Sequence, residues 1–208
     1  MSDKEDIGHL PEMHTQRDNA GSFGIMMVCT GNLCRSPMAA ALLARRLAVL
    51  GVTVPVRSAG MLGEGNPPFP EVVSVMGSYG IEIGLHRSRV ATADDLAGAS
   101  LVLAMTREHL RYAVTTEPGA WPRAFTLKEI VRRGEQIGPR RPDETFADWI
   151  ERVHAGRDRM SLLGYSAEDD VADPAGGPLH AYAETAGLLD RLVTRLAELG
   201  WAYAEPHP

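Results

Sequence analysis

Short apolar runs alternate with longer helical patterns along most of this chain. Residues 24–28 and 101–105 are almost entirely apolar and have the length of strands. Such runs predict strands that are covered on both faces, as in a parallel sheet packed between helices. Between them, residues 37–50 are rich in Ala and Leu, which favours a helix, and Gly51 is suited to end it.

The rest of the chain continues this alternation. Residues 52–57 predict a short strand, and Pro55 confines it to a sheet edge, because proline cannot donate a hydrogen bond to a neighbouring strand. The other predicted elements are helices over 71–79 and 108–114, a strand over 123–126, a helix from there to about 133, a helix over 144–154 that could continue to 163, and a last helix from 179. We therefore predict an α/β fold, a three-layer sandwich with a four-stranded parallel sheet.

Local signals support three of these helices. Thr126 and Glu129 form a capping box at the start of one of them. Apolar residues recur at helical spacing in the last two helices, which indicates one buried face on each. They are Phe146, Trp149, Ile150 and Val153 in the first, and Leu179, Tyr182, Ala186, Leu189, Val193 and Leu196 in the second. Residues 134–143 are polar and rich in Gly, Pro and Arg, as is typical of a linker.

The 208 residues are enough for one domain with a substantial core. Residues 1–22 mix Gly, Pro, His and charges without any period, which predicts a disordered or loosely attached arm. We expect a single domain over residues 23–204, with an insertion at about 132–168 that supplies an extra helical segment near 144–163. Trp201 is expected to begin a short tail.

Charge and composition argue against several classes of protein. A net charge of -6 disfavours a general binder of nucleic acid or of anionic membranes, since both need a basic surface. Two cysteines cannot form a disulfide framework, and no apolar run reaches the ~18 residues of a membrane span. The polar start of the chain does not resemble a secretory signal. The expected compartment is the cytoplasm, where a reactive thiol stays reduced.

The segment Cys-Thr-Gly-Asn-Leu-Cys-Arg-Ser-Pro, from Cys29 to Pro37, lies between the first strand and the first helix. The five residues between Cys29 and Arg35 can surround a tetrahedral anion with their N–H groups, and the Arg35 guanidinium can bind two of its oxygens. The loop follows the carboxyl end of the first predicted strand, which is where open α/β sheets bind ligands. We predict a phosphate site made of Thr30, Gly31, Asn32, Leu33, Cys34 and Arg35.

Each residue type in this loop suits that chemistry. Amide donors and a helix N-terminus can lower the pKa of a thiol well below its usual value of ~8.5, so Cys29 is predicted to be a thiolate nucleophile. Gly31 allows a positive φ, and Asn32 tolerates the left-handed region. Ser36 is predicted to cap the helix, and its hydroxyl could also contact Cys29.

Structural interpretations of these cysteines have to be weighed. A buried Cys is often only structural, so a Cys and an Arg at this spacing are a weak pattern by themselves. The preceding strand, the Gly-Asn pair and the Ser-Pro helix start favour the anion site. Cys34 is either a partner for a reversible disulfide that protects Cys29 from over-oxidation or a small apolar filler.

The loop resembles the signature loop of the low-molecular-weight protein tyrosine phosphatases, a family whose fold is shared with one class of arsenate reductases. Weaker similarity covers residues 24–105 and the chain from Asp173 to the last helix. An acidic loop is by composition more often a solvated turn, but the resemblance implies that Asp173, before Pro174, is the general acid.

The resemblance also implies two supporting residues. Ser58 is expected after the second strand and His86 before the third, where their hydrogen bonds would hold Asn32 and Ser36 in place. A lone histidine such as His86 is otherwise more often a structural group than a catalytic one.

These features predict a phosphomonoester hydrolase, and the family expectation is a protein tyrosine phosphatase. Cys29 would attack phosphorus to form a cysteinyl phosphate, and Asp173 would protonate the leaving oxygen and later activate water. Arg35 and the loop amides would stabilise the transferred group. The substrate would be a phosphorylated protein or a small phosphoester. No metal or cofactor is required, and the seven histidines show no metal-ligand spacing.

Departures from the family pattern leave the substrate open. Residues 61–65 and 175–177 contain no aromatic side chain where tyrosine-directed members carry them, and Phe69 is the only ring nearby in sequence. The slot could be wider, or walled by the insertion that contains Trp149. One alternative is an arsenate reductase that uses an external thiol, since no cysteine follows Cys34. Another is a phosphate-binding regulatory module without chemistry, which the set of Cys29, Arg35 and Asp173 disfavours.

Overall fold

Four parallel strands form the centre of the computed structural model, which describes residues 24–201. The strands are β1 (Ile25–Cys29), β2 (Val56–Gly60), β3 (Leu101–Ala104) and β4 (Ala124–Thr126), in the spatial order β2-β1-β3-β4. The predicted four-stranded parallel sheet is therefore confirmed. The predicted arm at 1–22 and the chain beyond Trp201 lie outside the described residues.

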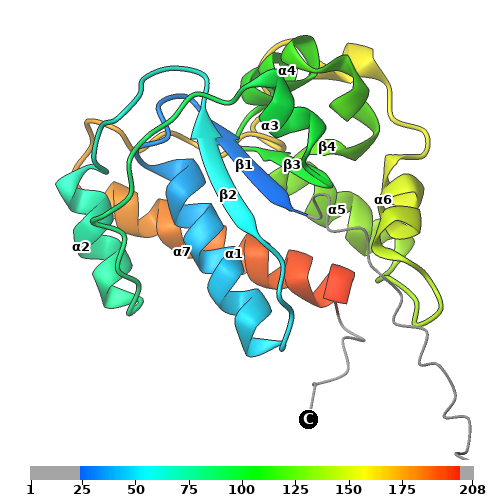
Figure 1. The fold of residues 1–208 in the computed structure, drawn as a ribbon, viewed down its shortest axis with the longest axis horizontal. Coiled ribbons are helices and arrows are strands. Elements are labelled where there is room, and N and C mark those ends of the chain that lie inside the picture. The colour runs from blue at the N-terminus through cyan, green and yellow to red at the C-terminus, as the bar shows by residue number, and fades with distance from the viewer. Residues whose placement is uncertain (1–23, 202–208) are drawn as a thin grey trace, which may run out of the picture.

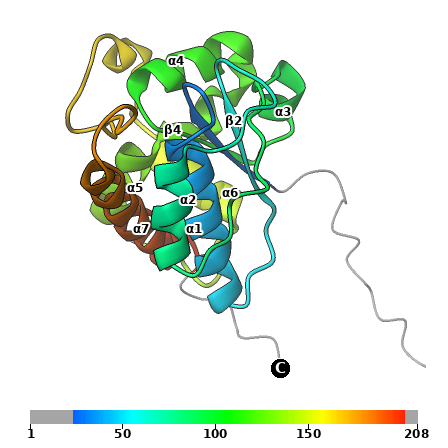
Figure 2. The same cartoon turned by 90° about the vertical axis from the view of Figure 1, so that its left-hand side faces the viewer.

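Helices cover both faces of this sheet (Figure 1). They are α1 (Arg35–Val49), α2 (Pro70–Ser78), α3 (Ala93–Ala97), α4 (Arg107–Thr116), α5 (Leu127–Ile137), α6 (Phe146–His154) and α7 (Leu179–Trp201), with short 3₁₀ helices η1 (Pro118–Arg123) and η2 (Arg159–Leu162). Most predicted helices are present within a few residues, and α1, α2 and α7 lie together on one side (Figure 2).

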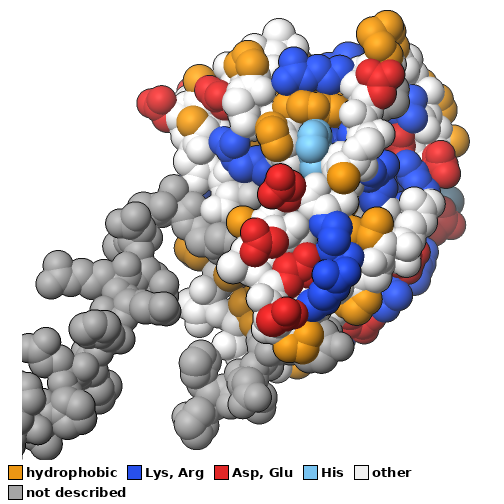
Figure 3. Space-filling model, turned by 90° about the vertical axis from the view of Figure 1, so that its right-hand side faces the viewer, with side chains coloured by type: hydrophobic (Ala, Val, Ile, Leu, Met, Phe, Trp, Pro, Cys, Tyr) orange, Lys and Arg blue, Asp and Glu red, His pale blue; other side chains and the backbone are white. Residues whose placement is uncertain are grey.

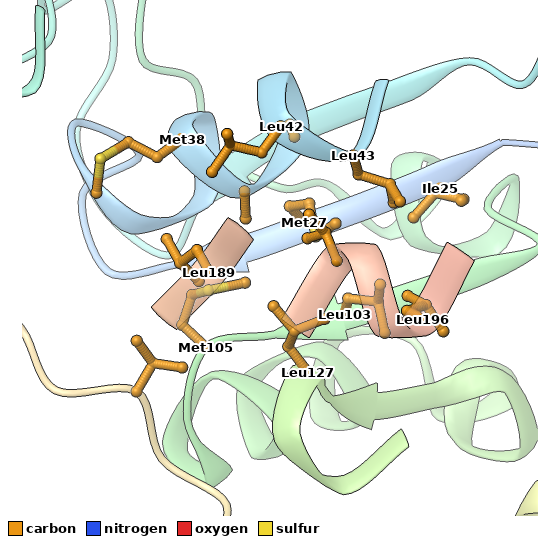
Figure 4. Packing of buried hydrophobic residues seen from close by; sticks show 14 of the residues in the cluster. Ile25, Met27, Met38, Leu42, Leu43, Leu103, Met105, Leu127, Leu189 and Leu196 are labelled. Carbon is orange, nitrogen blue, oxygen red and sulfur yellow. The ribbon is translucent and has the colours of Figure 1, made fainter. Parts of the chain in front are cut away.

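Side chains of β1 alternate between two cores. Ile25 and Met27 point toward α1 and α7, where they meet Leu43 and other apolar residues (Figure 4). Met26 and Val28 belong to a second core with residues of α3 and α4. All five residues of β1 are buried, as expected for a central parallel strand covered on both faces.

The second strand lies at the edge of the sheet, as Pro55 predicts, but it is displaced along the chain. It begins at Val56, directly after the proline, and pairs in register with β1 until Cys29 lies opposite Gly60. Ser58 therefore lies within β2 and not after it. The carboxyl ends of β1 and β2 meet where the loop after Cys29 begins.

The predicted linker at 134–143 is partly helical, because α5 continues to Ile137 and ends before Gly138, which has a φ of 86°. Helix α6 stops at His154 and does not run on to Leu163. A left-handed Gly156, with a φ of 75°, follows it and separates α6 from η2. Helix propensity did not predict that α5 extends to Ile137, nor that α6 ends shortly before Gly156.

Helix α6 packs into the core through its aromatic side chains. Trp149 is fully buried, and its indole N–H donates to the carbonyl of Gly138 at 3.2 Å. The ring of Trp201 stacks on Phe146 with centroids 4.5 Å apart, so Trp201 belongs to α7 and not to a tail. In the predicted apolar stripe of α7, Leu179 is instead 51% exposed because it begins the helix.

A buried ion pair fastens the residues that follow α6 to the sheet. The Arg157 guanidinium lies 4.1 Å from the ring centroid of Trp121 and 4.0 Å from that of Phe125, and it contacts the Glu129 carboxylate at 2.7 Å. On the surrounding face, basic and acidic side chains lie side by side and do not form a field of one sign (Figure 3). A separate ion pair joins Arg152 of α6 to Glu144 at 2.8 Å.

Candidate active site

The loop between β1 and α1 carries the predicted phosphate-binding residues. Its left-handed residue is Asn32, with a φ of 53°. The predicted positive φ at Gly31 is wrong, because Asn32 makes that turn of the backbone instead. The buried side chain of Asn32 forms hydrogen bonds that can compensate for the strain of this conformation.

Cys29 ends β1 at the floor of the loop and is 2% exposed. Its sulfur lies 2.9 Å from the hydroxyl oxygen of Ser36, which must donate this hydrogen bond when the sulfur is a thiolate. Ser36 does not cap α1. The helix begins at Arg35 without a side-chain cap, because the Ser36 hydroxyl faces the cysteine and the interior.

Asn32 joins the residues that the family resemblance named as supports. Its amide nitrogen donates to the hydroxyls of Ser36 and Ser58, both at 2.9 Å, and its side-chain oxygen accepts from the Arg89 N–H at 3.1 Å. The His86 ring nitrogen Nε2 lies 2.8 Å from the Asn32 carbonyl oxygen. Ser58 and His86 thus both contact Asn32, and Ser36 is linked to them only through it.

Gly60 is a residue of the site that the sequence did not single out. A Cβ at this position would lie 2.6 Å from the carbonyl oxygen of Thr30, closer than real Cβ atoms approach. The loop therefore rests directly on the backbone of β2. The sequence feature that could have pointed to Gly60 is the run of small residues, Ser-Ala-Gly, at the end of that strand.

Arg35 connects the loop with the distant acidic segment. Its side chain is 5% exposed, and it donates to the Thr30 hydroxyl and to the Val171 carbonyl at 3.1 Å each. It also contacts the Asp173 carboxylate at 2.5 Å. Asp173 is 43% exposed, so it lies at the mouth of the site and not in the core.

The segment before Asp173 is held by its neighbouring acidic residues. Asp169 contacts both Arg107 and Arg132 at 2.7 Å. The Asp170 carboxylate accepts from the backbone N–H of Arg107 at 2.7 Å and from that of Ser166 at 3.1 Å. The sequence presents these residues as one acidic loop, but the structure separates them: Asp169 and Asp170 contact Arg107 and its neighbours, whereas Asp173 contacts Arg35 and accepts from the Ala175 N–H at 3.2 Å.

His109 is a second residue that sequence reasoning missed. Its ring bridges two hydroxyls, with Nε2 2.9 Å from Thr30 Oγ1 and Nδ1 2.9 Å from Thr106 Oγ1. Burial, and secondarily the positive charge of Arg35, lower the pKa of His109 to about 3. The ring is therefore neutral at ordinary pH and keeps one nitrogen as an acceptor. Nothing in the local sequence distinguishes this histidine from a surface residue of an amphipathic helix.

Cys34 is a buried free thiol within the loop and belongs to the same core cluster as Met38. Burial, together with the negative charges of Asp173 and Cys29, raises the pKa of Cys34 to about 12. Cys34 is therefore a neutral thiol at physiological pH, which is compatible with the apolar-filler interpretation. A disulfide with Cys29 stays a prediction.

The aromatic surroundings of the site differ from the slot that the sequence left open. Trp149 is buried within the α5, α6 and α7 packing and does not wall the site. Phe69 packs edge-on against Tyr182 with centroids 6.4 Å apart. Tyr165 of the insertion, 78% exposed, lines a cavity that also contains Arg35 and Asp173.

Two further searches covered residues 24–201. None of their His, Cys, Asp and Glu side chains gather in threes or more at a spacing that could hold a metal ion. No helix in this part of the chain combines the length and apolar character needed to cross a bilayer.

Known proteins share both this loop and this fold. A sequence profile of the family described as low molecular weight phosphotyrosine protein phosphatase matches residues 24–138. A protein-arginine-phosphatase of Geobacillus stearothermophilus is 34% identical over 177 residues, which cover 85% of this chain and 95% of that protein. A probable low molecular weight protein-tyrosine-phosphatase of Ralstonia solanacearum is 35% identical over 144 residues, covering 67% and 97%. The crystal structure of a low molecular weight protein tyrosine phosphatase from T. tengcongensis is 35% identical with a TM-score of 0.65, covering 85% of this chain and 99% of that one.

Proposed function

This chain belongs to the low molecular weight phosphotyrosine protein phosphatase family, and we propose that it dephosphorylates proteins through a cysteinyl-phosphate intermediate. Membership makes it a hydrolase of the phosphatase class. The mechanism rests on the residues that the fold brings together around the loop after β1. The observation that carries it is the contact between Arg35 and Asp173, which lie 138 positions apart in the sequence and 2.5 Å apart in space.

The first chemical step uses the anion site. The substrate phosphoryl group binds to the loop amides and to the Arg35 guanidinium. The N–H groups of Arg35 then donate to phosphoryl oxygens in place of the Asp173 carboxylate. The Cys29 sulfur attacks phosphorus, the bond from phosphorus to the leaving atom breaks, and Asp173 gives its proton to that atom. The Ser36 hydroxyl, 2.9 Å from the sulfur, stabilises the thiolate before attack.

The second step reverses the role of the carboxyl group. Asp173, now ionised, takes a proton from a water molecule, and the water oxygen attacks phosphorus. The phosphorus–sulfur bond breaks, inorganic phosphate leaves and Cys29 returns as a thiolate. Arg35 and the loop amides stabilise the equatorial oxygens in both steps.

Phosphoarginine is the substrate class that we propose first. The relative named a protein-arginine-phosphatase and the solved structure named a tyrosine phosphatase each align over 85% of this chain, so the choice between the two substrates rests on the residues around the acid. The residues after the acid are Ala175, Gly176 and Gly177, which offer no ring for a phenyl group to stack on. A guanidinium leaving group instead presents N–H donors, which suit the exposed Asp173 carboxylate.

Phosphotyrosine is the second candidate, favoured by the family profile over residues 24–138. The named relatives reported above are phosphatases, so the arsenate-reductase alternative rests on the shared loop and fold alone.

Steady-state rates separate these candidates. We expect the wild-type protein to hydrolyse a phosphoarginine peptide with a higher kcat/KM than the matched phosphotyrosine peptide, and the opposite order would select the second candidate. Cys29→Ser should abolish both activities, and Asp173→Asn should lower kcat about a hundredfold to ten-thousandfold. Asp94→Asn on α3 is the matched control. Arsenate-dependent consumption of an added thiol without phosphatase activity would overturn the proposal.

A further inference from the structure

A cavity of about 370 Å³ opens beside the proposed acid and is not used by the mechanism above. Arg35 and Asp173 are among its lining residues, and so are Glu108 and Arg111 of α4. Gly164 and Tyr165, from the segment that the sequence analysis predicts to be an insertion, also line it. The cavity is therefore continuous with the phosphate site and large enough for a second side chain of a bound protein.

The wall supplied by the insertion is held in place on both sides of Tyr165. The Arg111 guanidinium donates to the carbonyl oxygen of Leu162 and, at 3.1 Å, to that of Gly164. The N–H of Ser166 donates to the Asp170 carboxylate at 3.1 Å. Helix η2, just before this segment, packs beside α4 (Figures 1 and 2). The tyrosine ring is thus presented from a fixed backbone.

Two side chains of the cavity make no hydrogen bond, ion pair or ring contact with the residues that the structure describes. Tyr165 is 78% exposed, and within residues 24–201 its hydroxyl makes no hydrogen bond and its ring makes no aromatic or cation–π contact. Glu108, on the first turn of α4, is exposed, and its carboxylate has no partner among residues 24–201. The charges around Tyr165 and Glu108 indicate what kind of chemical group they can bind.

The charges around the cavity favour a cation. Its carboxylates are Glu108, Asp170 and Asp173, against the two guanidiniums of Arg35 and Arg111. Arg35 is committed to the phosphoryl group and Arg111 to the carbonyls of the insertion. Among these carboxylates, Glu108 is the one that has no hydrogen-bond or ion-pair partner among residues 24–201, and the face of an exposed tyrosine ring attracts ammonium and guanidinium groups.

We propose that this cavity is a subsite for a lysine or arginine side chain next to the phosphorylated residue of a protein substrate. Glu108 pairs with the cationic group and the Tyr165 ring lies against it, so both residues determine specificity and neither takes part in the chemistry. The inference rests on the proposed function, because it assumes that a phosphorylated protein binds at Arg35.

Binding can be measured without turnover by using Cys29→Ser as the background. Fluorescence anisotropy would give Kd for two pairs of peptides, one pair carrying phosphoarginine and the other phosphotyrosine. Within each pair, the residues that flank the phosphorylated position are lysine or glutamate. In the pair that binds, we expect the peptide with flanking lysines to have a Kd about three- to tenfold lower than the peptide with flanking glutamates. The ratio of these two Kd values should decrease toward one as salt is added.

Substitutions then assign the preference to the cavity. Glu108→Gln should bring the ratio of Kd values close to one, and Glu108→Lys should reverse it. Tyr165→Ala should reduce the ratio, whereas Tyr165→Phe, which keeps the ring, should retain it. Glu82→Gln, on an exposed glutamate outside the cavity, is the matched control and should leave the ratio unchanged.

Equal affinity for the two peptides of each pair, or a ratio unchanged in Glu108→Lys, would overturn the subsite. Failure of the phosphatase function is a separate result. It would appear as absence of turnover of every phosphopeptide by the protein with Cys29 intact, while the Kd ratio would still decide whether the cavity selects a cation.

Discussion

Replacing His109 with glutamine should weaken the dependence of stability on pH. His109 is 1% exposed, and the cost of burying a positive charge there, with Arg35 nearby, lowers its pKa from 6.5 to about 3. Glutamine does not titrate, and its amide can both donate to one threonine hydroxyl and accept from the other. The substitution therefore removes the proton equilibrium while keeping polar partners for Thr30 and Thr106.

The sign and size of the effect follow from the two pKa values of His109. Below pH 6.5 the unfolded chain takes up a proton that the folded protein does not, so stability is retained above that pH and lost as the pH falls toward about 3. Each pH unit in this window corresponds to about 1.4 kcal/mol. Between pH 7 and pH 5, His109 should therefore remove about 2 kcal/mol from the free energy of unfolding.

Urea denaturation at the two pH values measures this difference. We expect the wild-type free energy of unfolding to fall by about 2 kcal/mol more than that of His109→Gln between pH 7 and pH 5. The other histidines and the carboxylates are present in both proteins and cancel in the comparison. Equal losses in the two proteins would show that His109 titrates normally when folded, and would refute its assignment as a neutral bridge.

Three further predictions concern the frame of the site. Arg157→Met leaves the Glu129 carboxylate buried without its partner, so it should cost about 3–5 kcal/mol in a denaturant titration, and adding Glu129→Gln should recover part of that loss. Gly60→Ala should push the predicted phosphate loop aside and lower kcat/KM about ten- to a hundredfold. Gly84→Ala, where an added Cβ meets no atom within 4 Å, should leave kcat/KM unchanged. Equal effects of the two substitutions would contradict the close backbone contact at Gly60. At pH 8, Cys34 should resist iodoacetamide in the native protein and react only after unfolding, since its pKa is raised to about 12, and rapid native labelling of Cys34 would contradict that burial.

Much of the sheet could be predicted because its signals are local. The apolar runs at 24–28 and 101–105 correspond to β1 and β3, and the proline at position 55 correctly marked an edge strand. Helix boundaries were less accessible where packing decides them. Helix α5 runs through a polar stretch to Ile137 because Gly134 lets Trp149 and Leu199 pack closely against it. The short helix α3 was missed, although Thr92 and Asp95 form a capping box.

In the candidate site too, features within one stretch of sequence were predictable and contacts between distant residues were not. Its loop lies in one stretch of sequence, so residue types and order were enough to predict the Cys29–Ser36 contact, and the anion site stays a prediction. The hydrogen bond from His109 to Thr30 spans 79 positions, and no pattern in one sequence specifies such a pairing. Tyr165 was hidden for a different reason: the sequence suggested that the insertion could wall the site, but only the packing decides that Trp149 is buried and the tyrosine is exposed.

The most direct test of the account is to find the covalent intermediate. A substrate with a radioactive phosphoryl group would be mixed with the protein, the reaction stopped within one turnover, and the labelled peptide identified by mass spectrometry. The account predicts one phosphoryl group on the sulfur of Cys29, and no label in Cys29→Ser. Label on another residue, or phosphate release that persists in Cys29→Ser, would contradict the nucleophilic role of this cysteine.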